Sequence, residues 1–431
     1  MKAVVLAGGK GTRLGLDRIP KVMVPVDGVP LLERTVTNAV SQGFSDFLIL
    51  TGYLAEEIES HFGDGQRYGA RIEYVREEQP LGTAGCFNQV RDRLTEPFLV
   101  LYGDILMDVD LTAFAGYAIE RGGAGTLFAH PNDHPFDSDL LEVDTEGRIL
   151  AVHPKPHRPG VHRPNLVSAA LYLLFPEALA SVRPGPSDWG RDVFPRLVEE
   201  QPTFAYRSCE YVKDIGTPER LERAERHLRT GRLQKLALRT SKPAVFLDRD
   251  GVINEERGGV HSPREVSLIA GSAQAIKSFN DAGIPVICVT NQPDLAKGLM
   301  SWDDLRTVGG EIDYQLADEA GAYLDDILIC PHHPERGWAG EVPELKVACD
   351  CRKPADGLLR AAASSHNLDL ARSWLVGDRY CDIAAGLSAG ARTILVSTGH
   401  NGNDKSRYSV EPTVRCPDLL SAAETILRDL Q

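Results

Sequence analysis

Ala244-Val-Phe-Leu-Asp-Arg-Asp-Gly-Val-Ile-Asn254 is a short apolar run that ends in two carboxylates. Residues 244–247 predict a buried strand, and Asp248 and Asp250 then point the same way because they lie two apart on extended backbone. Gly251 permits a sharp turn away from the strand end. Two carboxylates at such a point suit an anionic nucleophile, a proton carrier and a divalent cation. For the pair alone, a polar strand end would be the favoured interpretation, so the downstream residues decide its role.

Polar side chains also follow the other strands predicted in this half of the chain. Thr290 and Asn291 follow one strand, and Asp378 follows another. Arg352 and Lys353 add two cations immediately before a predicted helix. Because the carboxyl ends of parallel strands meet at one edge of a sheet, we expect these groups to converge on Asp248. This combination indicates phosphoryl transfer through an aspartyl phosphate.

Three of the eight cysteines cluster near a histidine. Cys330 and His332 form one close pair, and Cys349 and Cys351 form another. Three thiolates and an imidazole can complete a closed, tetrahedral and therefore structural Zn²⁺ site, although His333 offers an alternative imidazole. In a long chain without a signal peptide, this spacing favours a metal site over a disulfide framework.

The bulk composition is that of a globular protein with more than one domain. The chain has 431 residues, of which 42% are hydrophobic and 25% are charged, and that length exceeds one ordinary core. The net charge of -14 argues against a general nucleic-acid-binding surface. No apolar run is long enough to span a bilayer, and the N-terminus enters a strand directly, so we expect a cytoplasmic protein. The oligomeric state is left open.

The first half opens on a predicted strand, residues 2–7, followed by the loop Gly8-Gly-Lys-Gly-Thr-Arg13. The loop offers backbone N–H groups and two cations, which suit a triphosphate. It lacks the ending of a P-loop and the dinucleotide fingerprint, so the loop alone leaves a plain turn equally open. Asp104 follows a later strand and Asp214 precedes a helix, which are positions where open α/β sheets bind ligands.

Strands and helices alternate along both halves, which predicts an α/β protein with two doubly wound, Rossmann-like domains. The predicted domains are residues 1–238 and 244–431, joined by a linker at 239–243 that ends at proline. The strands are predicted at 47–51, 71–75, 98–102, 285–289, 324–329 and 374–376, and the helices at 31–42, 54–62, 83–94, 217–238 and 272–282.

Five motifs of the first half resemble the sugar-1-phosphate nucleotidyltransferases, over about residues 1–230. They are Gly8-Gly-X-Gly-Thr-Arg13, Pro20-Lys21, Pro80-Leu-Gly-Thr-Ala84, Gly103-Asp104 and Asp214-Ile-Gly-Thr-Pro218, in the order of that family. The resemblance implies that Lys21 and Arg13 are catalytic and that Asp104 and Asp214 bind Mg²⁺. The residues that it assigns to the nucleotide are Gly8, Gly9, Gly11, Thr12, Arg13, Gln79, Gly82 and Thr83.

The sugar side of this domain departs from the family pattern. Ser168-Ala-Ala-Leu-Tyr172 stands where many relatives have Asn-Ala-Gly before the tyrosine. Lys155 matches a second family lysine that meets the sugar phosphate, and its alternative role is that of a solvated loop lysine. The sugar is therefore left open by this half of the chain.

The second half resembles the haloacid-dehalogenase-type phosphatases over about residues 244–400. By that resemblance Asp248 is the nucleophile and Asp250 the acid and base. Thr290 and Lys353 bind the transferring phosphoryl group, and Asp378 completes a Mg²⁺ site with Asp248 and the Asp250 carbonyl.

The Cys/His pairs make this half similar to the heptose-bisphosphate phosphatases, which are close to the histidinol-phosphate phosphatases with a zinc loop. The same resemblance assigns the sugar phosphate to Asn291 and Arg352. Pro293-Asp-Leu-Ala-Lys-Gly298 departs from the usual Ser-Gly-Ile-Ala-Arg-Gly. The sequence therefore determines the substrate selectivity of this half less well than its phosphatase chemistry.

Together the resemblances imply a bifunctional enzyme with small-molecule substrates and consecutive steps. The second domain removes the 7-phosphate of D-glycero-D-manno-heptose 1,7-bisphosphate, and the first joins the 1-phosphate to a nucleotide, with GTP favoured. One alternative pairs a histidinol-phosphate-type phosphatase with a hexose-1-phosphate transferase. Another makes the first domain a non-catalytic nucleotide sensor.

Overall fold

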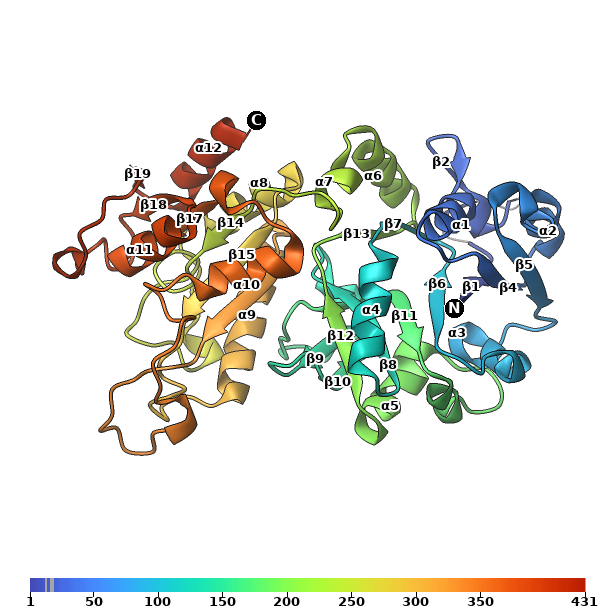
Figure 1. Ribbon diagram of the computed structural model, residues 1–431, viewed down its shortest axis with the longest axis horizontal. Helices are drawn as coiled ribbons and strands as arrows, with labels where there is room; N and C mark the ends of the chain where they lie inside the picture. Colours follow the sequence, from blue (N-terminus) through green and yellow to red (C-terminus); the bar gives the residue numbers. More distant parts are fainter. Residues whose placement is uncertain (12–13, 16–18, 431) are drawn as a thin grey trace. The chain divides into compact units, whose positions relative to one another are not determined.

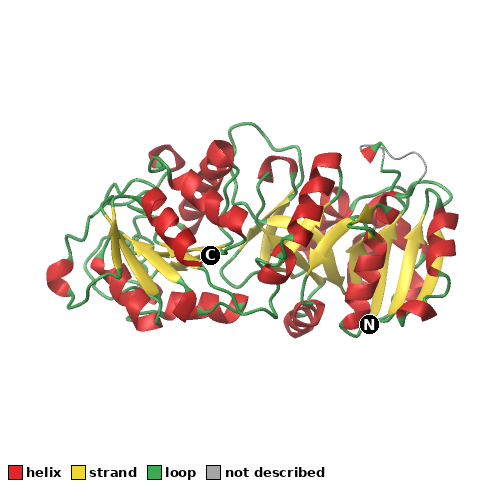
Figure 2. Cartoon of the chain, turned by 90° about the horizontal axis from the view of Figure 1, so that it is seen from above, coloured by secondary structure: helices red, strands yellow, loops and turns green. Residues whose placement is uncertain are grey.

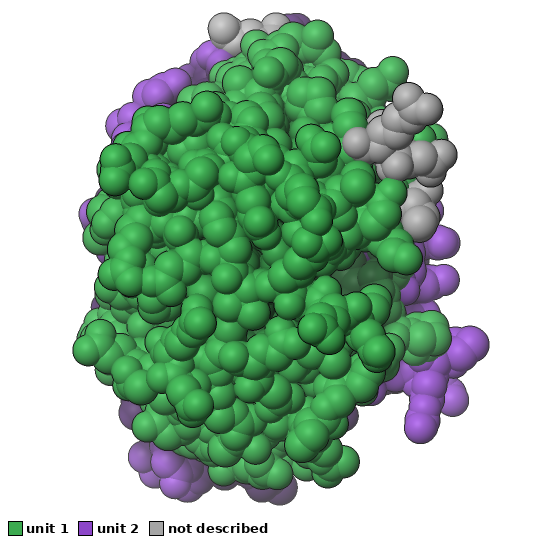
Figure 3. All heavy atoms as spheres, turned by 90° about the vertical axis from the view of Figure 1, so that its right-hand side faces the viewer, with its two compact units in different colours: residues 1–130, 137–157, 167–237 green, residues 131–136, 158–166, 238–431 purple. Residues whose placement is uncertain are grey.

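The computed structural model describes residues 1–11, 14–15 and 19–430, and these form two compact units (Figure 3). Unit 1 comprises residues 1–130, 137–157 and 167–237, and unit 2 comprises residues 131–136, 158–166 and 238–431. Each unit is built around its own sheet (Figure 1).

Among the described residues, unit 1 holds a nine-stranded sheet centred on β1 (Lys2–Ala7). This strand lies between β4 (Asp46–Thr51) and β6 (Phe98–Tyr102), and all three run parallel. Beyond β6 the direction changes, because β11 (Val167–Leu174) pairs antiparallel with it, so the sheet is mixed. The other strands of this unit are β2 (Pro25–Val26), β3 (Val29–Pro30), β5 (Arg71–Arg76), β7 (Ile105–Asp108), β8 (Gly125–His130), β9 (Leu140–Val143), β10 (Ile149–His153), β12 (Thr203–Arg207) and β13 (Tyr211–Asp214).

The helices of unit 1 pack apolar faces against this sheet. In α1 (Leu31–Ser41), Leu32, Val36 and Ala39 recur at helical spacing and are completely buried in one core with Val5 of β1. Burial of each large aliphatic side chain contributes about 1.5–3 kcal/mol. The other helices are α2 (Ala55–Phe62), α3 (Gly82–Gly85), α4 (Leu111–Arg121), α5 (Phe194–Glu200), α6 (Pro218–Arg229) and α7 (Arg232–Leu236).

Two helices differ from the expectation. The helix predicted at 83–94 stops at Gly85 and continues only as short 3-10 turns, because the Asn88 side chain hydrogen-bonds the main-chain carbonyls of Gly85 and Arg183. The helix predicted at 217–238 is split into α6 and α7 by Gly231, whose φ of 70° is left-handed.

Unit 2 contains, in its described part, a six-stranded sheet in the order β16-β15-β14-β17-β18-β19, and every pair is parallel. This is the doubly wound architecture that the sequence predicts. The strands are β14 (Val245–Leu247), β15 (Val286–Asn291), β16 (Asp326–Cys330), β17 (Trp374–Gly377), β18 (Arg392–Val396) and β19 (Val414–Cys416).

Helices cover both faces of the unit 2 sheet (Figure 2). Val245 and Leu247 of β14 pack in one core with α8 (Ser272–Ala282), α9 (Trp302–Ala320) and α12 (Leu419–Leu430). Phe246 points the other way, into a core with α10 (Gly357–His366) and α11 (Tyr380–Ala389). The alternation follows from the two-residue period of a strand, and burial on both faces explains why β14 is apolar throughout. The carboxyl ends of β14, β15 and β17 consequently lie side by side at one edge of the sheet.

None of the helices in the described part of the chain has the length and apolar character needed to cross a bilayer.

Candidate functional site

A buried lysine joins the strand ends of unit 2. Lys353 Nζ lies 2.8 Å from Asp248 Oδ1 and 2.7 Å from Asp382 Oδ1, and it donates to the Val289 carbonyl at 2.7 Å. Lys353 is 3% exposed and Asp382 is completely buried. The two flanking carboxylates raise the pKa of Lys353 against the effect of burial, so it stays charged. A fixed cation therefore stands beside Asp248, the residue predicted to be the nucleophile.

A third carboxylate completes this group. Ligand atoms of Asp248, Asp378 and Asp382 all lie within 4.8 Å of one another. Burial and the neighbouring carboxylates of Asp248 and Asp382 together raise the pKa of Asp378 to about 8. Its Oδ1 is buried and has no hydrogen-bond partner among the described residues. Three buried carboxylates facing one ammonium leave an excess of negative charge, and this set of oxygen donors fits Mg²⁺.

The Asp250 carboxylate is held apart from this group. The Arg249 guanidinium lies 2.8 Å from its Oδ2, and the Asn254 and Gln292 amides each donate to it at 2.9 Å. Burial opposes ionisation, yet Arg249 and these hydrogen bonds lower the pKa of Asp250 below its usual value. In this conformation the residue predicted to carry protons is an ionised carboxylate.

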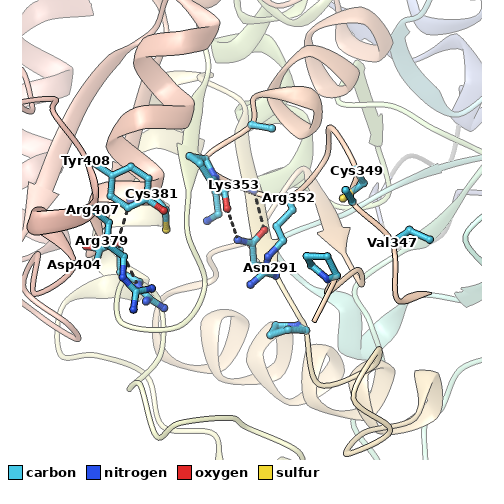
Figure 4. A pocket seen from close by; sticks show the side chains of 15 residues that line it. Asn291, Val347, Cys349, Arg352, Lys353, Arg379, Cys381, Asp404, Arg407 and Tyr408 are labelled. Atoms are coloured by element: carbon cyan, nitrogen blue, oxygen red, sulfur yellow. Dashed lines mark hydrogen bonds and ion pairs between the residues drawn. The ribbon is translucent and has the colours of Figure 1, made fainter. Parts of the chain in front are cut away.

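Thr290 and Asn291 occupy the end of β15, as the strand pattern predicts. Thr290 is 1% exposed, and its hydroxyl accepts a hydrogen bond from Gln292 at 2.9 Å. The Asn291 amide donates to the Lys353 carbonyl at 3.0 Å and accepts from the Lys353 N–H at 3.1 Å (Figure 4). The Asn291 amide thus fixes the lysine loop against the strand.

The four predicted zinc ligands converge in unit 2. The sulfur atoms of Cys330 and Cys349 lie 3.6 Å apart, and those of Cys349 and Cys351 lie 3.3 Å apart. His332 Nδ1 is 3.2 Å from the Cys351 sulfur, and all four atoms fall within 4.8 Å. Zn–S bonds of about 2.3 Å in a tetrahedron imply sulfur separations of roughly 3.8 Å. The four residues therefore fit a structural Zn²⁺ ion.

The structure chooses between the two adjacent histidines of this loop. His332 joins the cysteines, whereas the His333 ring lies edge-on to Trp338 with ring centroids 5.1 Å apart. Arg352 donates to the His332 carbonyl at 3.2 Å. This hydrogen bond ties the cluster to the Arg352–Lys353 pair.

The predicted centre of unit 1 is also organised by a lysine. Lys21 Nζ lies 2.5 Å from Asp104 Oδ2 and 3.2 Å from Asp214 Oδ1. Burial lowers the pKa of Lys21, but the two carboxylates outweigh it and the pKa is raised. Asp104 follows β6 and Asp214 ends β13, so two separate sheets deliver the pair.

Arg220 extends this centre, although none of the motifs assigns it a role. Its Nη1 lies 2.6 Å from Asp214 Oδ2, and its Nη2 lies 3.3 Å from Asp137 Oδ2. The Asp137 carbonyl in turn accepts a hydrogen bond from Lys155 Nζ at 2.7 Å. Lys155 is exposed but connected to the centre through Asp137 and Arg220.

Of the predicted phosphate loop, Thr12 and Arg13 lie outside the described residues. Gly11 has a φ of 64°, and a Cβ atom there would stand 2.8 Å from Lys21 Cβ. A Cβ at Gly8 would lie 3.1 Å from the Glu77 carboxylate, whereas one at Gly9 would meet nothing within 4 Å. Glycine at position 11 therefore allows the loop to approach the lysine closely.

The second glycine loop is fixed by the segment around Ser187. Gly82 has a φ of 75°, and a Cβ there would stand 2.4 Å from the Ser187 carbonyl oxygen. The Thr83 hydroxyl donates to Asp188 at 2.5 Å, and Gln79 is exposed. Asp188 is thus a further polar group of this loop that no motif indicated.

The departure on the sugar side has a structural counterpart in β11. Ala170 stands where many relatives carry glycine and has a φ of 55°. The pairing of β11 with β8 is irregular between Ser168 and Tyr172. Strand β11 therefore forms this bulge with an alanine at a positive φ, a conformation that glycine adopts more easily.

Asp382 lies four residues after Asp378 in the sequence, and none of the motifs assigns it a role. Its spacing from that aspartate was the available signal, but its contact with Lys353 required the fold.

The chain was compared with known families and structures. The nucleotidyl transferase family matches residues 2–231, and the HAD-hydrolase-like family matches residues 350–422. The D-glycero-beta-D-manno-heptose-1,7-bisphosphate 7-phosphatase of Yersinia pestis is 39% identical over 160 residues, which cover 37% of this chain and 82% of that protein. The corresponding phosphatase of Thermosynechococcus vestitus is 39% identical over 192 residues, which cover 44% of this chain and 97% of that protein.

Solved structures resemble each half. The D,D-heptose 1,7-bisphosphate phosphatase of B. bronchiseptica, complexed with magnesium and phosphate, is 35% identical and covers 43% of this chain and 99% of its own, with a TM-score of 0.39. HddC from Yersinia pseudotuberculosis is 22% identical and covers 53% of this chain and 99% of its own, with a TM-score of 0.46.

The nucleotidyl transferase match spans Lys21, Asp104 and Asp214, and the HAD-hydrolase-like match spans Lys353 and Asp378. The chain therefore belongs to the nucleotidyl transferase family through residues 2–231 and to the family of D-glycero-D-manno-heptose-1,7-bisphosphate 7-phosphatases through its C-terminal half.

Proposed function

We propose that this chain carries two consecutive steps of heptose activation. Residues 244–431 hydrolyse the 7-phosphate of D-glycero-D-manno-heptose 1,7-bisphosphate, and residues 1–238 transfer a nucleotidyl group to the resulting 1-phosphate. The observation that carries the proposal is the Lys353 bridge between Asp248 and Asp382, with Asp378 beside it. The relatives' substrate supplies the sugar.

In the phosphatase step, an Asp248 oxygen attacks phosphorus and the bond to the C7 oxygen breaks, giving an aspartyl phosphate. Lys353 and the Thr290 hydroxyl bind the phosphoryl oxygens. Asp250 protonates the leaving oxygen, and it must first take up a proton and leave the Arg249 guanidinium that holds it. It then removes a proton from the water that hydrolyses the aspartyl phosphate.

The residues that would hold Mg²⁺ in this unit are Asp248, Asp378 and the Asp250 carbonyl. The cation supplies screening between the Asp248 carboxylate and the anionic phosphoryl group. The residues that would hold Zn²⁺ are Cys330, His332, Cys349 and Cys351, which order the loop that carries Arg352 and Lys353.

In the transferase step, a phosphate oxygen of the sugar 1-phosphate attacks the α-phosphorus of the nucleotide and pyrophosphate leaves. Several anions meet there, so positioning and cationic screening must supply the catalysis. Lys21 provides a partly buried cation, and Asp104 and Asp214 are the residues that would hold Mg²⁺. We favour GTP as the nucleotide donor and place Gln79, Gly82 and Thr83 against its base and ribose.

Incubation of the full chain with the bisphosphate, Mg²⁺ and each of four NTPs tests the proposal. We expect inorganic phosphate and, with GTP, pyrophosphate and a GDP-heptose in one reaction. Phosphate release without any nucleotide sugar, across all NTPs, would remove the transferase half. If the chain hydrolyses histidinol phosphate in preference to the heptose bisphosphate, histidinol phosphate becomes the proposed phosphatase substrate.

Two matched variants separate the steps. Asp248→Asn is expected to abolish phosphate release while it transfers a nucleotide to pre-made heptose 1-phosphate at the wild-type rate. Asp214→Asn is expected to abolish nucleotidyl transfer while it releases phosphate at the wild-type rate. Loss of both activities in either correctly folded variant would contradict two separate centres.

A further inference from the structure

Two segments of the N-terminal half belong to unit 2 (Figure 3). Residues 131–136 and 158–166, called here the anchored segments, pack with the C-terminal part of the chain, whereas residues 137–157 between them belong to unit 1. Asn132 and Asn165 join the two segments. The Asn132 N–H donates to the Asn165 side-chain oxygen at 3.1 Å, and the Asn165 amide donates to the Asn132 carbonyl at 2.7 Å. The anchored segments therefore form one folded piece, which the chain leaves and then rejoins.

The anchored segments meet helix α9 at a glycine. A Cβ atom at Gly310 would lie 2.8 Å from the main chain of Arg163, which is closer than a side-chain carbon approaches, so glycine permits this contact. Glycine inside a helix is destabilising relative to alanine, and Gly310 lies in the interior of the 19-residue α9. At the neighbouring Gly309, no atom of the described residues lies within 4 Å of the same position. Close packing against Arg163 thus gives a reason for glycine at 310 that does not apply at 309.

Polar and aromatic contacts hold the anchored segments on the same helix. The buried Asp313 carboxylate accepts a hydrogen bond from the Asn165 main-chain N–H at 2.8 Å. The His162 ring stacks on the Tyr314 ring with centroids 3.5 Å apart and an interplanar angle of 3°. The Phe136 ring meets Tyr314 edge-on, with centroids 5.5 Å apart. Both anchored segments therefore contact Tyr314 of α9.

The stretch between the anchored segments starts and ends at residues that bind each other. Lys155 Nζ donates to the Asp137 carbonyl at 2.7 Å, and the Lys155 N–H donates to the Asp139 carboxylate at 3.1 Å. His157 Nε2 lies 2.8 Å from the Ser138 carbonyl oxygen. Asp137 and His157 directly adjoin the anchored segments in the sequence. The position of Lys155 consequently depends on where these segments are held.

We propose that the face of α9 formed by Gly310, Asp313 and Tyr314 positions the loop that carries Lys155. These three residues lie three and four apart on the helix and so share one face. The proposal rests on the proposed transferase function and on the assignment of Lys155 to the phosphate of the sugar 1-phosphate. The three residues are positioning residues, because they act on Lys155 through the anchored segments. A helix of the phosphatase half thereby sets the affinity of the transferase half for its sugar substrate.

The test compares neighbouring glycines of α9 in the full chain. Gly310→Ala places a methyl group against the anchored segments, whereas Gly309→Ala makes the same change in helix propensity without that contact. Tyr314→Ala removes the ring that both segments touch, and Tyr314→Phe keeps it as the conservative variant. Pyrophosphate release gives kcat and KM for heptose 1-phosphate and for GTP. Phosphate release from the bisphosphate gives kcat/KM of the phosphatase centre in the same preparations.

We expect Gly310→Ala and Tyr314→Ala to raise KM for heptose 1-phosphate by about tenfold or more, because a small displacement of a substrate-positioning group has a large effect. KM for GTP and kcat/KM of the phosphatase centre should keep their wild-type values. Gly309→Ala and Tyr314→Phe should match wild type in every constant. An unchanged KM for heptose 1-phosphate in both disrupting variants, or an equal loss in the phosphatase reaction, overturns the proposal.

Amide hydrogen exchange distinguishes a failure of this proposal from a failure of the proposed function. The Lys155 N–H is hydrogen-bonded, so we expect exchange within residues 137–157 to accelerate about tenfold in Gly310→Ala and Tyr314→Ala but not in Gly309→Ala. If wild type forms no nucleotide sugar from heptose 1-phosphate, the proposed function fails. Unchanged exchange in both disrupting variants overturns the positioning role, whatever the substrate.

Discussion

Replacing Lys353 by methionine removes the ammonium that pairs with the buried carboxylates of Asp248 and Asp382 in unit 2. Lys353 pairs with both Asp248 and Asp382, and its loss leaves these two buried carboxylates without that counter-charge. Lys353 is 3% exposed, and Asp248 and Asp382 lie within 2.8 Å of its Nζ. Breaking a buried ion pair on one side costs about 3–5 kcal/mol. We therefore expect the calorimetric transition of unit 2 to fall by about 6–20 °C.

The double variant Lys353→Met/Asp382→Asn separates stability from chemistry. Removing the Asp382 charge together with the Lys353 charge returns the net charge of the group to its wild-type value, so we expect most of the lost stability to return. Phosphate release should stay about 10²- to 10³-fold below wild type, because the cation that binds the phosphoryl group is still missing. Pyrophosphate release by unit 1 in the same samples is the internal control. A Lys353→Met protein with an unchanged melting temperature, or a double variant with wild-type phosphatase activity, would refute this reasoning.

Three further predictions concern other parts of the chain. Burial and nearby cations lower the pKa of His227 to about 4. Its neutral form is therefore preferred in the fold, and its contribution to stability is complete above pH 6.5 and lost as the pH falls towards 4. Because the ring is half-exposed, we expect this contribution to the free energy of unfolding to be about 1–2 kcal/mol. It is measured as the loss of unfolding free energy in urea between pH 7 and pH 4.5, compared between wild type and His227→Gln. Gly82→Ala forces a methyl group to within 2.4 Å of the Ser187 carbonyl at a left-handed φ, so kcat/KM for the NTP should fall about tenfold or more, whereas Gly116→Ala, with open space around it, should not change it. Cys351→Ser should lower the zinc content from one ion per chain, measured by atomic absorption, and an unchanged content would show that the four ligands do not act together.

Much of the architecture could be predicted because it depends on local pattern. The apolar runs at β1 and β14 lie within a residue of their predicted bounds, since buried parallel strands need continuous apolar sequence. The helix predicted at 83–94 was wrong because the Asn88 side chain bonds to the Gly85 carbonyl, which a helix would use, and to the distant Arg183 carbonyl. Local periodicity in the sequence cannot indicate a hydrogen-bond partner that is 95 residues away.

The sequence by itself determined which chemical groups stand at the strand ends. Asp248, Thr290 and Asp378 each follow an apolar run directly, so the parallel sheet alone brings them to one edge. The same logic applies to Asp104 after β6.

Only the tertiary structure decided how the loops complete these centres. Lys353 reaches Asp248 and Asp382, Arg220 joins Asp214, and His332 rather than His333 turns to the cysteines. The physical reason is that a strand fixes the direction of its side chains by its two-residue period, whereas a loop side chain takes its place from contacts made far along the chain.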